Sequence, residues 1–120
     1  MNNVTRAAVL TLAMCLPIAG ASAADTLSGE EIRDTVSDHT VEGSMMESGP
    51  YAEFYQADGM IKGDGYTGSW SIVDDTMCFE YGGEPAGCWE VGMEDGKLMW
   101  MQDGEMLGDG MAQPGNTNGF

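Results

Sequence analysis

Apolar and polar side chains alternate in short segments over residues 51–107, and turn-forming residues separate the segments. The turn signals are Asp58-Gly59, Asp74-Asp75, residues 82–87, Asp95-Gly96 and Asp103-Gly104. Alternation with a period of two between such turns is typical of an antiparallel β-meander. We therefore expect a mainly β fold of about five to seven strands, with a loop at residues 63–68.

The turns also predict which residues face each other on neighbouring strands. Two-residue turns at residues 95–96 and 103–104 would place Val91 opposite Trp100, and Trp100 opposite Leu107. Because a slip of one residue exchanges the two faces of a strand, the agreement between successive turns supports this register.

At these registers the large apolar side chains gather on one face of the sheet. This expected core or ligand-binding face holds Trp70, Ile72, Met77, Phe79, Trp89, Val91, Met93, Leu98, Trp100 and Leu107. The opposite face holds Cys78, Glu80, Cys88, Glu90, Met99, Met101 and Met106. The four aromatic members of the first face, Trp70, Phe79, Trp89 and Trp100, are the candidate contacts for a ligand.

One helix is expected, ahead of the strands. Ser28 and Glu31 have the spacing of a capping box, in which each side chain satisfies a backbone N–H at the helix start. Ile32 and Val36 follow four residues apart, so they form a narrow apolar stripe that can pack on a sheet. The pattern predicts a helix over residues 29–37.

Residues 1–23 have the pattern of a secretory signal peptide. Arg6 precedes an apolar run over residues 7–18, and Ala21-Ser22-Ala23 forms a small-residue cleavage site. The run is too short to cross a bilayer as a helix, and we expect no membrane insertion. The chain should then comprise one β-domain over residues 24–107, followed by a disordered Gly/Asn/Pro-rich tail over residues 108–120.

Two cysteines, Cys78 and Cys88, remain after the expected cleavage. A pairing of Cys78 with Cys88 agrees with the register above and would staple a hairpin. The pair lacks the C-x-x-C spacing of redox-active sites, so we expect a structural disulfide in an oxidising compartment. The periplasm or the extracellular medium is therefore the expected location.

The formal net charge of −16 comes from 20 acidic residues against four basic ones. Nucleic acid and anionic membranes bind cationic surfaces, so this balance excludes both as expected partners. An acidic surface of this kind otherwise serves solubility.

Several short motifs are distributed over the chain after residue 23: the helix segment 27–32, residues 39–43, Gly68-Ser69-Trp70 and Cys88-Trp89-Glu90-Val91. In these motifs the chain resembles a family of small secreted proteobacterial β-domains of unknown function. The resemblance implies the β fold and the disulfide but no activity. A fainter similarity, in size, export, one disulfide and a Gly-x-Trp motif, links the chain to lipocalin-like inhibitors of bacterial metalloproteases.

Candidate chemistry is sparse. His39 is the single histidine and lies beside no recognisable nucleophile, which favours a structural role. Met99, Met101 and Met106 would lie together on the non-core face, and thioethers are soft ligands for Cu(I). We expect no catalytic residues, no cofactor and no other metal ligands.

The sequence thus predicts a non-enzymatic periplasmic or secreted domain, a short helix followed by a meander curled into a lipocalin-like half barrel. Its expected partner is a small apolar ligand or an envelope protein. Inhibition of a periplasmic enzyme such as a protease is the alternative function, and Cu(I) binding is the third.

Overall fold

The computed structural model describes residues 25–120, so the expected signal peptide over residues 1–23 lies outside the described residues. The described chain contains one helix and a nine-stranded sheet. In chain order the elements are β1 (Asp25–Thr26), α1 (Gly29–Val36), β2 (His39–Met45), β3 (Gly49–Tyr55), β4 (Met60–Gly63), β5 (Tyr66–Val73), β6 (Thr76–Tyr81), β7 (Glu84–Glu94), β8 (Lys97–Gln102) and β9 (Glu105–Pro114).

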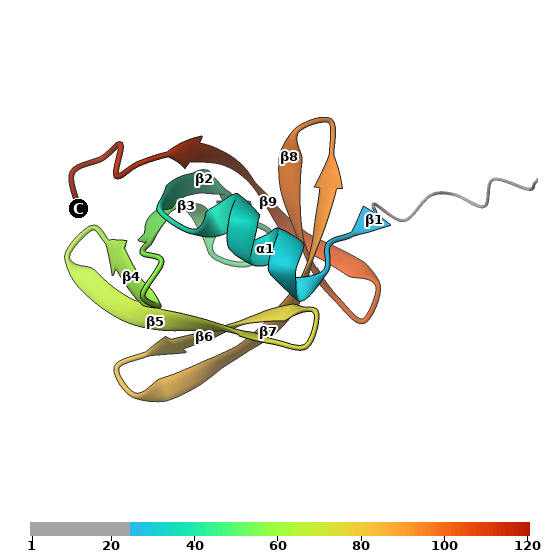
Figure 1. Ribbon diagram of the computed structural model, residues 1–120, viewed down its shortest axis with the longest axis horizontal. Helices are drawn as coiled ribbons and strands as arrows, with labels where there is room; N and C mark the ends of the chain where they lie inside the picture. Colours follow the sequence, from blue (N-terminus) through green and yellow to red (C-terminus); the bar gives the residue numbers. More distant parts are fainter. Residues whose placement is uncertain (1–24) are drawn as a thin grey trace, which may run out of the picture.

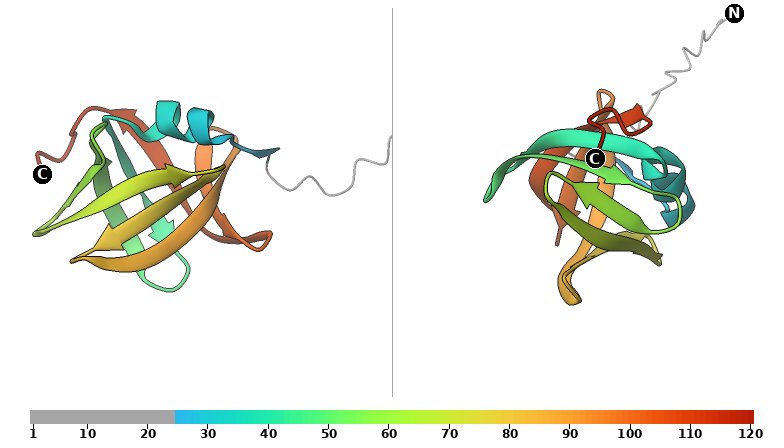
Figure 2. Two further views of the ribbon diagram at one scale, coloured as in Figure 1. Left: turned by 60° about the horizontal axis from the view of Figure 1, so that its bottom comes forward. Right: turned by 90° about the vertical axis from the view of Figure 1, so that its left-hand side faces the viewer.

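The strands β2 to β9 close into an antiparallel, lipocalin-like barrel (Figures 1 and 2). Each strand pairs with the next in sequence, and β2 pairs with β9 to complete the ring. The short strand β1 adds to the last residues of β7. The expected mainly β, lipocalin-like meander with an N-terminal helix is confirmed. Its strands outnumber the five to seven expected, and β2 and β9 join the two edges so that the barrel is closed.

Tight turns set the hairpin registers. Asp74, Asp95 and Asp103 have positive φ angles of 54°, 50° and 51°, as the two-residue turns that match strand twist require. The predicted pairs Trp70 with Phe79 and Val91 with Trp100 are both present. The loop expected over residues 63–68 is instead a two-residue turn at residues 64–65, flanked by paired residues of β4 and β5.

The register predicted for the pairing of β8 with β9 is wrong, because this pairing contains a β-bulge. Trp100 lies opposite Gly108 and Met101 opposite Met106, so Leu107 is an extra residue on β9. Such a bulge shifts the pairing by one position. Leu107 is consequently half-buried rather than part of the core, and Met93 from the predicted core face is also exposed.

The segment over residues 108–120, expected to be disordered, is instead part of the fold. Its first seven residues continue β9, which pairs with β2 from Gly108 opposite Met45 to Gln113 opposite Thr40. The expectation rested on the glycine content, but Gly110 lies where a Cβ atom would collide with Val41 and the Tyr51 hydroxyl. Glycine here permits close packing rather than disorder.

The residues after β9 lie against the outer face of β2. Thr40 Oγ1 donates to the Gly115 carbonyl oxygen at 2.7 Å and accepts from the Thr117 N–H at 3.0 Å. Thr40 is 1% exposed in consequence. The domain therefore extends past residue 107 to include these residues.

Helix α1 begins with the predicted capping box of Ser28 and Glu31, and it lies in front of the barrel in Figure 1. It contacts β2, β5 and β6, and the Gly29 N–H donates to Asp75 Oδ1 at the β5–β6 turn. Ile32 and Val36 are fully buried in one cluster with inward-facing strand residues such as Val91 and Leu98. The helix therefore closes the end of the barrel at the β5–β6 turn with apolar side chains.

No helix within residues 25–120 has the length and apolar character to cross a membrane.

Candidate ligand-binding site

The end of the barrel remote from α1 contains a cavity of about 750 Å³, a size typical of small-molecule sites. Its lining comes from the barrel interior and from the segments near the β2–β3, β4–β5 and β6–β7 turns. The lining residues are Met45, Ser48, Tyr51, Glu53, Tyr55, Tyr66, Thr67, Phe79, Tyr81, Gly82, Ala86, Trp89 and Trp100. The core cluster that includes Ile32, Val36, Val91 and Leu98 fills the helix-facing part of the barrel, and the cavity opens toward the other end.

The alternation of side chains along each strand explains why the central residues of the cavity point into the barrel. On β3, Tyr51, Glu53 and Tyr55 point inward because successive side chains of a strand point to opposite faces. Strand β6, which is separated from β3 by β4 and β5 in the sheet, contributes Phe79 and Tyr81 by the same alternation. Polar and aromatic groups from separate strands therefore converge on one point inside the barrel.

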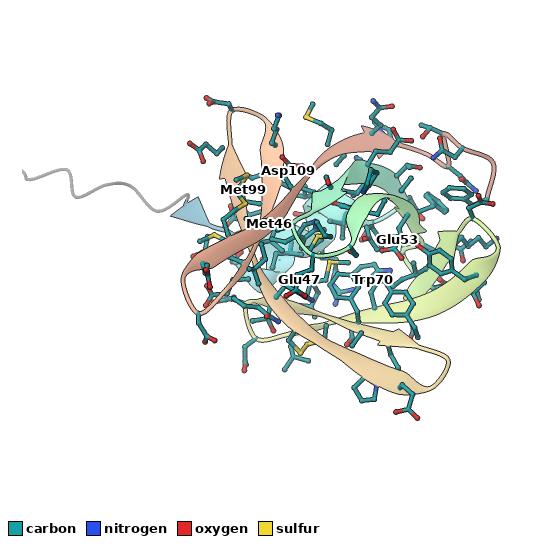
Figure 3. All side chains as sticks on the ribbon, turned by 180° about the vertical axis from the view of Figure 1, so that it is seen from behind. Met46, Glu47, Glu53, Trp70, Met99 and Asp109 are labelled. Carbon is teal, nitrogen blue, oxygen red and sulfur yellow. A yellow bond between two sulfur atoms is a disulfide. The ribbon has the colours of Figure 1, made fainter. Side chains whose placement is uncertain are left out.

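That point is the carboxylate of Glu53, which is 7% exposed and lies within the barrel in Figure 3. The Tyr55 hydroxyl donates to Oε1 at 3.0 Å, and the Tyr66 hydroxyl donates to Oε2 at 2.8 Å. The Tyr81 hydroxyl lies 3.0 Å from Oε1 and 2.8 Å from Oε2, so it reaches both oxygens. Three tyrosines on three strands thus hold one buried carboxylate.

Within the described chain, the residues lining this cavity include no lysine, arginine or histidine. A buried carboxylate normally needs a charged partner or several hydrogen bonds to offset its lost hydration. Glu53 has the hydrogen bonds, from neutral hydroxyls, and its charge is not neutralised by a basic lining residue. The interior of the barrel is therefore apolar, aromatic and anionic.

Burial keeps the tyrosine hydroxyls protonated. Desolvation raises the pKa of Tyr51 to about 12. Desolvation first, and then the charge of Glu53, raise the pKa of Tyr55 and of Tyr81 well above the usual value, and desolvation and the hydrogen bond to Glu53 do the same for the pKa of Tyr66. All four side chains are consequently hydrogen-bond donors at ordinary pH.

Aromatic rings line the wall beside Glu53. The Phe79 ring lies edge-on to Trp100 with centroids 5.6 Å apart, and edge-on to Tyr55 at 6.1 Å. Tyr81 stacks nearly parallel to Phe79 at 6.5 Å. The Trp100 Nε1–H donates to the Tyr51 hydroxyl, which fixes the indole orientation.

Three of the four aromatic candidates, Phe79, Trp89 and Trp100, line this cavity. The fourth, Trp70, is 5% exposed in the core, and its Nε1–H donates to the Gln56 carbonyl oxygen. Cys78 and Cys88 form the predicted disulfide across the β6–β7 hairpin.

Sequence reasoning missed Glu53 and the tyrosines around it. The segment Tyr51-Ala52-Glu53-Phe54-Tyr55 does alternate, but a glutamate at an inward position resembles the outward face of a strand. The signal that could have found the site is the aromatic residue on each side of Glu53 at a spacing of two.

The methionines proposed for Cu(I) are placed differently from one another. Met106 is 43% exposed, Met101 is 5% exposed, and Met99 is half-buried opposite Asp109. Met101 is therefore buried, although it lies outside the core cluster. Among residues 25–120, no three His, Cys, Asp or Glu side chains are grouped so that they could hold a metal ion. The one histidine, His39, lies with Nδ1 2.7 Å from the Ser37 carbonyl oxygen.

Comparison of the chain with protein-family models, with curated proteins and with solved structures gave no match. The chemistry of the cavity is therefore the basis on which a function can be argued.

Proposed function

We propose that this protein is a non-enzymatic binding protein that holds a small molecule with an apolar body inside its barrel. The observation that carries the proposal is the cavity of about 750 Å³, walled by aromatic rings, with a few polar groups meeting at Glu53. Binding sites for small molecules combine an apolar wall with a small number of convergent polar groups in this way.

The tyrosine hydroxyls around Glu53 support binding rather than group transfer. The side chains that converge on Glu53 are tyrosines whose raised pKa values oppose proton loss near neutral pH. They therefore serve as fixed hydrogen-bond donors. A rigid barrel closed at one end by α1 and open at the other presents such donors at constant geometry.

The disulfide supports a periplasmic or extracellular location, since such bonds persist in oxidising compartments. An envelope protein as partner, protease inhibition and Cu(I) binding stay predictions, because the cavity argues for none of them.

The test is a fluorescence titration with a neutral apolar dye, N-phenyl-1-naphthylamine, in which Trp89 and Trp100 act as energy donors from the cavity wall. Ala86 lies exposed at the mouth, so Ala86→Trp should obstruct entry and weaken dye binding severalfold. Ala57→Trp is the matched control, since Ala57 is exposed in the β3–β4 turn and outside the cavity lining. No dye binding by the unmodified protein, or equal effects of the two variants, would refute the proposal.

A further inference from the structure

The charge of Glu53 has a consequence for which ligand the barrel accepts. The carboxylate is 7% exposed, and the described residues that line the cavity with it include no basic side chain. An anionic ligand would place a second negative charge beside Glu53 in a medium of low dielectric constant, where repulsion is strong. A cationic ligand would instead supply the missing positive charge.

The hydrogen bonds that Glu53 already accepts limit how many N–H donors a cationic ligand can pair with it. A carboxylate offers about four acceptor positions on its two oxygens. Tyr55 donates to Oε1, Tyr66 donates to Oε2, and the Tyr81 hydroxyl, which has one proton, lies 2.8–3.0 Å from both oxygens. The three hydroxyl protons leave about one acceptor position open, so a primary ammonium, with three N–H donors, would leave about two of them unpaired at Glu53. A quaternary ammonium brings the charge and no N–H donors.

The wall of the cavity suits a cation without N–H groups. Faces of Phe, Tyr and Trp rings attract cations by their quadrupole, and groups of such rings recognise methylated ammonium groups. Phe79 lies beside both Trp100 and Tyr81, with centroids 5.6 Å and 6.5 Å away, and the Tyr81 hydroxyl reaches Glu53. The same surface accommodates methyl groups as apolar contacts.

We infer that the barrel binds a quaternary ammonium group on an apolar body, with the cation between Glu53 and the neighbouring aromatic rings. This inference rests on the proposed function, since it names the ligand class for the same cavity. The volume of about 750 Å³ leaves room for the apolar body beyond the ammonium group.

Isothermal titration calorimetry of the unmodified chain with four six-carbon probes tests the ligand class. The probes are hexyltrimethylammonium, hexylammonium, 1-hexanol and hexanoate, which share the alkyl body and differ in the head group. We expect hexyltrimethylammonium to bind about tenfold more tightly than 1-hexanol, in line with a desolvated cation–π contact plus a carboxylate. Hexylammonium should bind less tightly than hexyltrimethylammonium, and hexanoate should bind least.

Glu53→Gln removes the charge while keeping a side chain of similar shape. It should abolish the preference of hexyltrimethylammonium over 1-hexanol and leave the affinity for 1-hexanol within about twofold. Glu90→Gln is the matched control, because Glu90 is exposed on β7 and outside the lining, and removes the same charge from the surface. It should preserve the preference.

Tyr66→Phe provides a second variant, with little risk to the fold because Tyr66 is 43% exposed. It frees one acceptor position on Oε2, which an N–H donor can then occupy. Hexylammonium should gain affinity relative to hexyltrimethylammonium in this variant. Ser71→Ala, which removes an exposed hydroxyl from the same strand outside the cavity lining, should leave the ratio unchanged.

The outcomes separate the two proposals. Equal affinity of the unmodified chain for 1-hexanol and hexyltrimethylammonium, with the dye still bound, would overturn the ligand class and leave the binding function standing. A preference for hexanoate, or a cation preference that persists in Glu53→Gln, would also overturn it. If Glu53→Gln fails to fold, the probe series on the unmodified chain and the Tyr66→Phe ratio still decide the question.

Discussion

At the residue scale, the barrel interior depends on how one carboxylate is held. Glu53 sits on β3 between two inward tyrosines, and its partners come from β3, β5 and β6. A buried polar network of this kind is stable only while every member is satisfied, since the low dielectric constant that strengthens each bond also raises the cost of losing one. The four tyrosines therefore serve packing and polar satisfaction together.

Tyr51 gives a test of this network. Its hydroxyl donates to the Asp109 carbonyl oxygen and accepts from Trp100 Nε1–H, each at 2.7 Å. Tyr51→Phe leaves both partners without that bond, and we expect it to lower the free energy of unfolding by about 1–3 kcal/mol. Urea unfolding of the two proteins at neutral pH measures the difference, and an unchanged midpoint would contradict it.

The Tyr51 hydroxyl should also make the free energy of unfolding depend on pH in the alkaline range. Burial raises the pKa of Tyr51 to about 12, whereas a tyrosine in the unfolded chain ionises near pH 10. The unfolded state then loses its proton first, so the stabilisation is complete below about pH 10 and is lost as the pH rises toward 12. Urea unfolding at about pH 8 and pH 11 should show a smaller decline for Tyr51→Phe than for the unmodified protein. Parallel declines would show that Tyr51 titrates alike in both states.

At the element scale, the β6–β7 hairpin carries both the disulfide and part of the cavity wall. Cys78 and Cys88 face each other, while Phe79 and Trp89, one residue further along each strand, point to the opposite face and line the cavity. The covalent bond on the outer face therefore holds the strands that present two of the aromatic rings. Stability of the hairpin and shape of the cavity are linked.

The disulfide should be complete in exported material. Thiol titration of the denatured protein should find neither Cys78 nor Cys88 free, and two free thiols would contradict a structural bond. Reduction should lower the free energy of unfolding by roughly 3 kcal/mol, because a short loop is no longer closed in the unfolded chain. Paired urea melts with and without reductant measure this loss.

The two tryptophans of the cavity wall should separate stability from binding. Trp100 is 3% exposed within the core cluster, so Trp100→Ala should cost about 3–5 kcal/mol. Trp89 is half-buried and packs at the periphery of that cluster, so Trp89→Ala should cost less and should chiefly weaken dye binding. Urea melts and dye titrations of both variants test this, and a larger stability loss for Trp89→Ala would reverse the assignment.

Sequence patterns predicted what is local. Turn residues set the pairing of Trp70 with Phe79 and of Val91 with Trp100, because a two-residue turn fixes the register of its own hairpin. They could not predict the bulge at Leu107, which depends on how β9 meets both β8 and β2. Glu53 escaped detection because a glutamate in an alternating segment normally marks the outward face of a strand. Only the closed barrel shows that this position faces inward.

At the scale of the whole molecule, β9 joins the last hairpin to the first. It pairs with β8 along its first half and with β2 from Gly108 onward, and both pairings are needed for the ring. The cavity exists only when this ring is closed, since its lining comes from β2, β3, β5, β6, β7 and β8 and the turns between them. The ordered residues beyond 107 are thus part of what makes a binding site possible.

Two truncated chains test this role. A chain that ends at residue 107 loses every described pairing between β2 and β9 and should show no cooperative unfolding. A chain that ends at residue 114 keeps these pairings and loses the bonds of Thr40 with Gly115 and Thr117, so it should fold with a stability lower by about 1–3 kcal/mol. Urea melts followed by tryptophan fluorescence compare the two, and a cooperative transition in the shorter chain would contradict the closure role of β9.

The pairing of β2 with β9 also governs when the chain can fold. Contacts between segments so far apart in sequence form late, because the intervening chain must be ordered before they repay the entropy of closing the loop. β9 leaves the ribosome after the other described strands, so the edge of β2 that pairs with it stays unpaired until then. The barrel can therefore close only after its last strand has been synthesised.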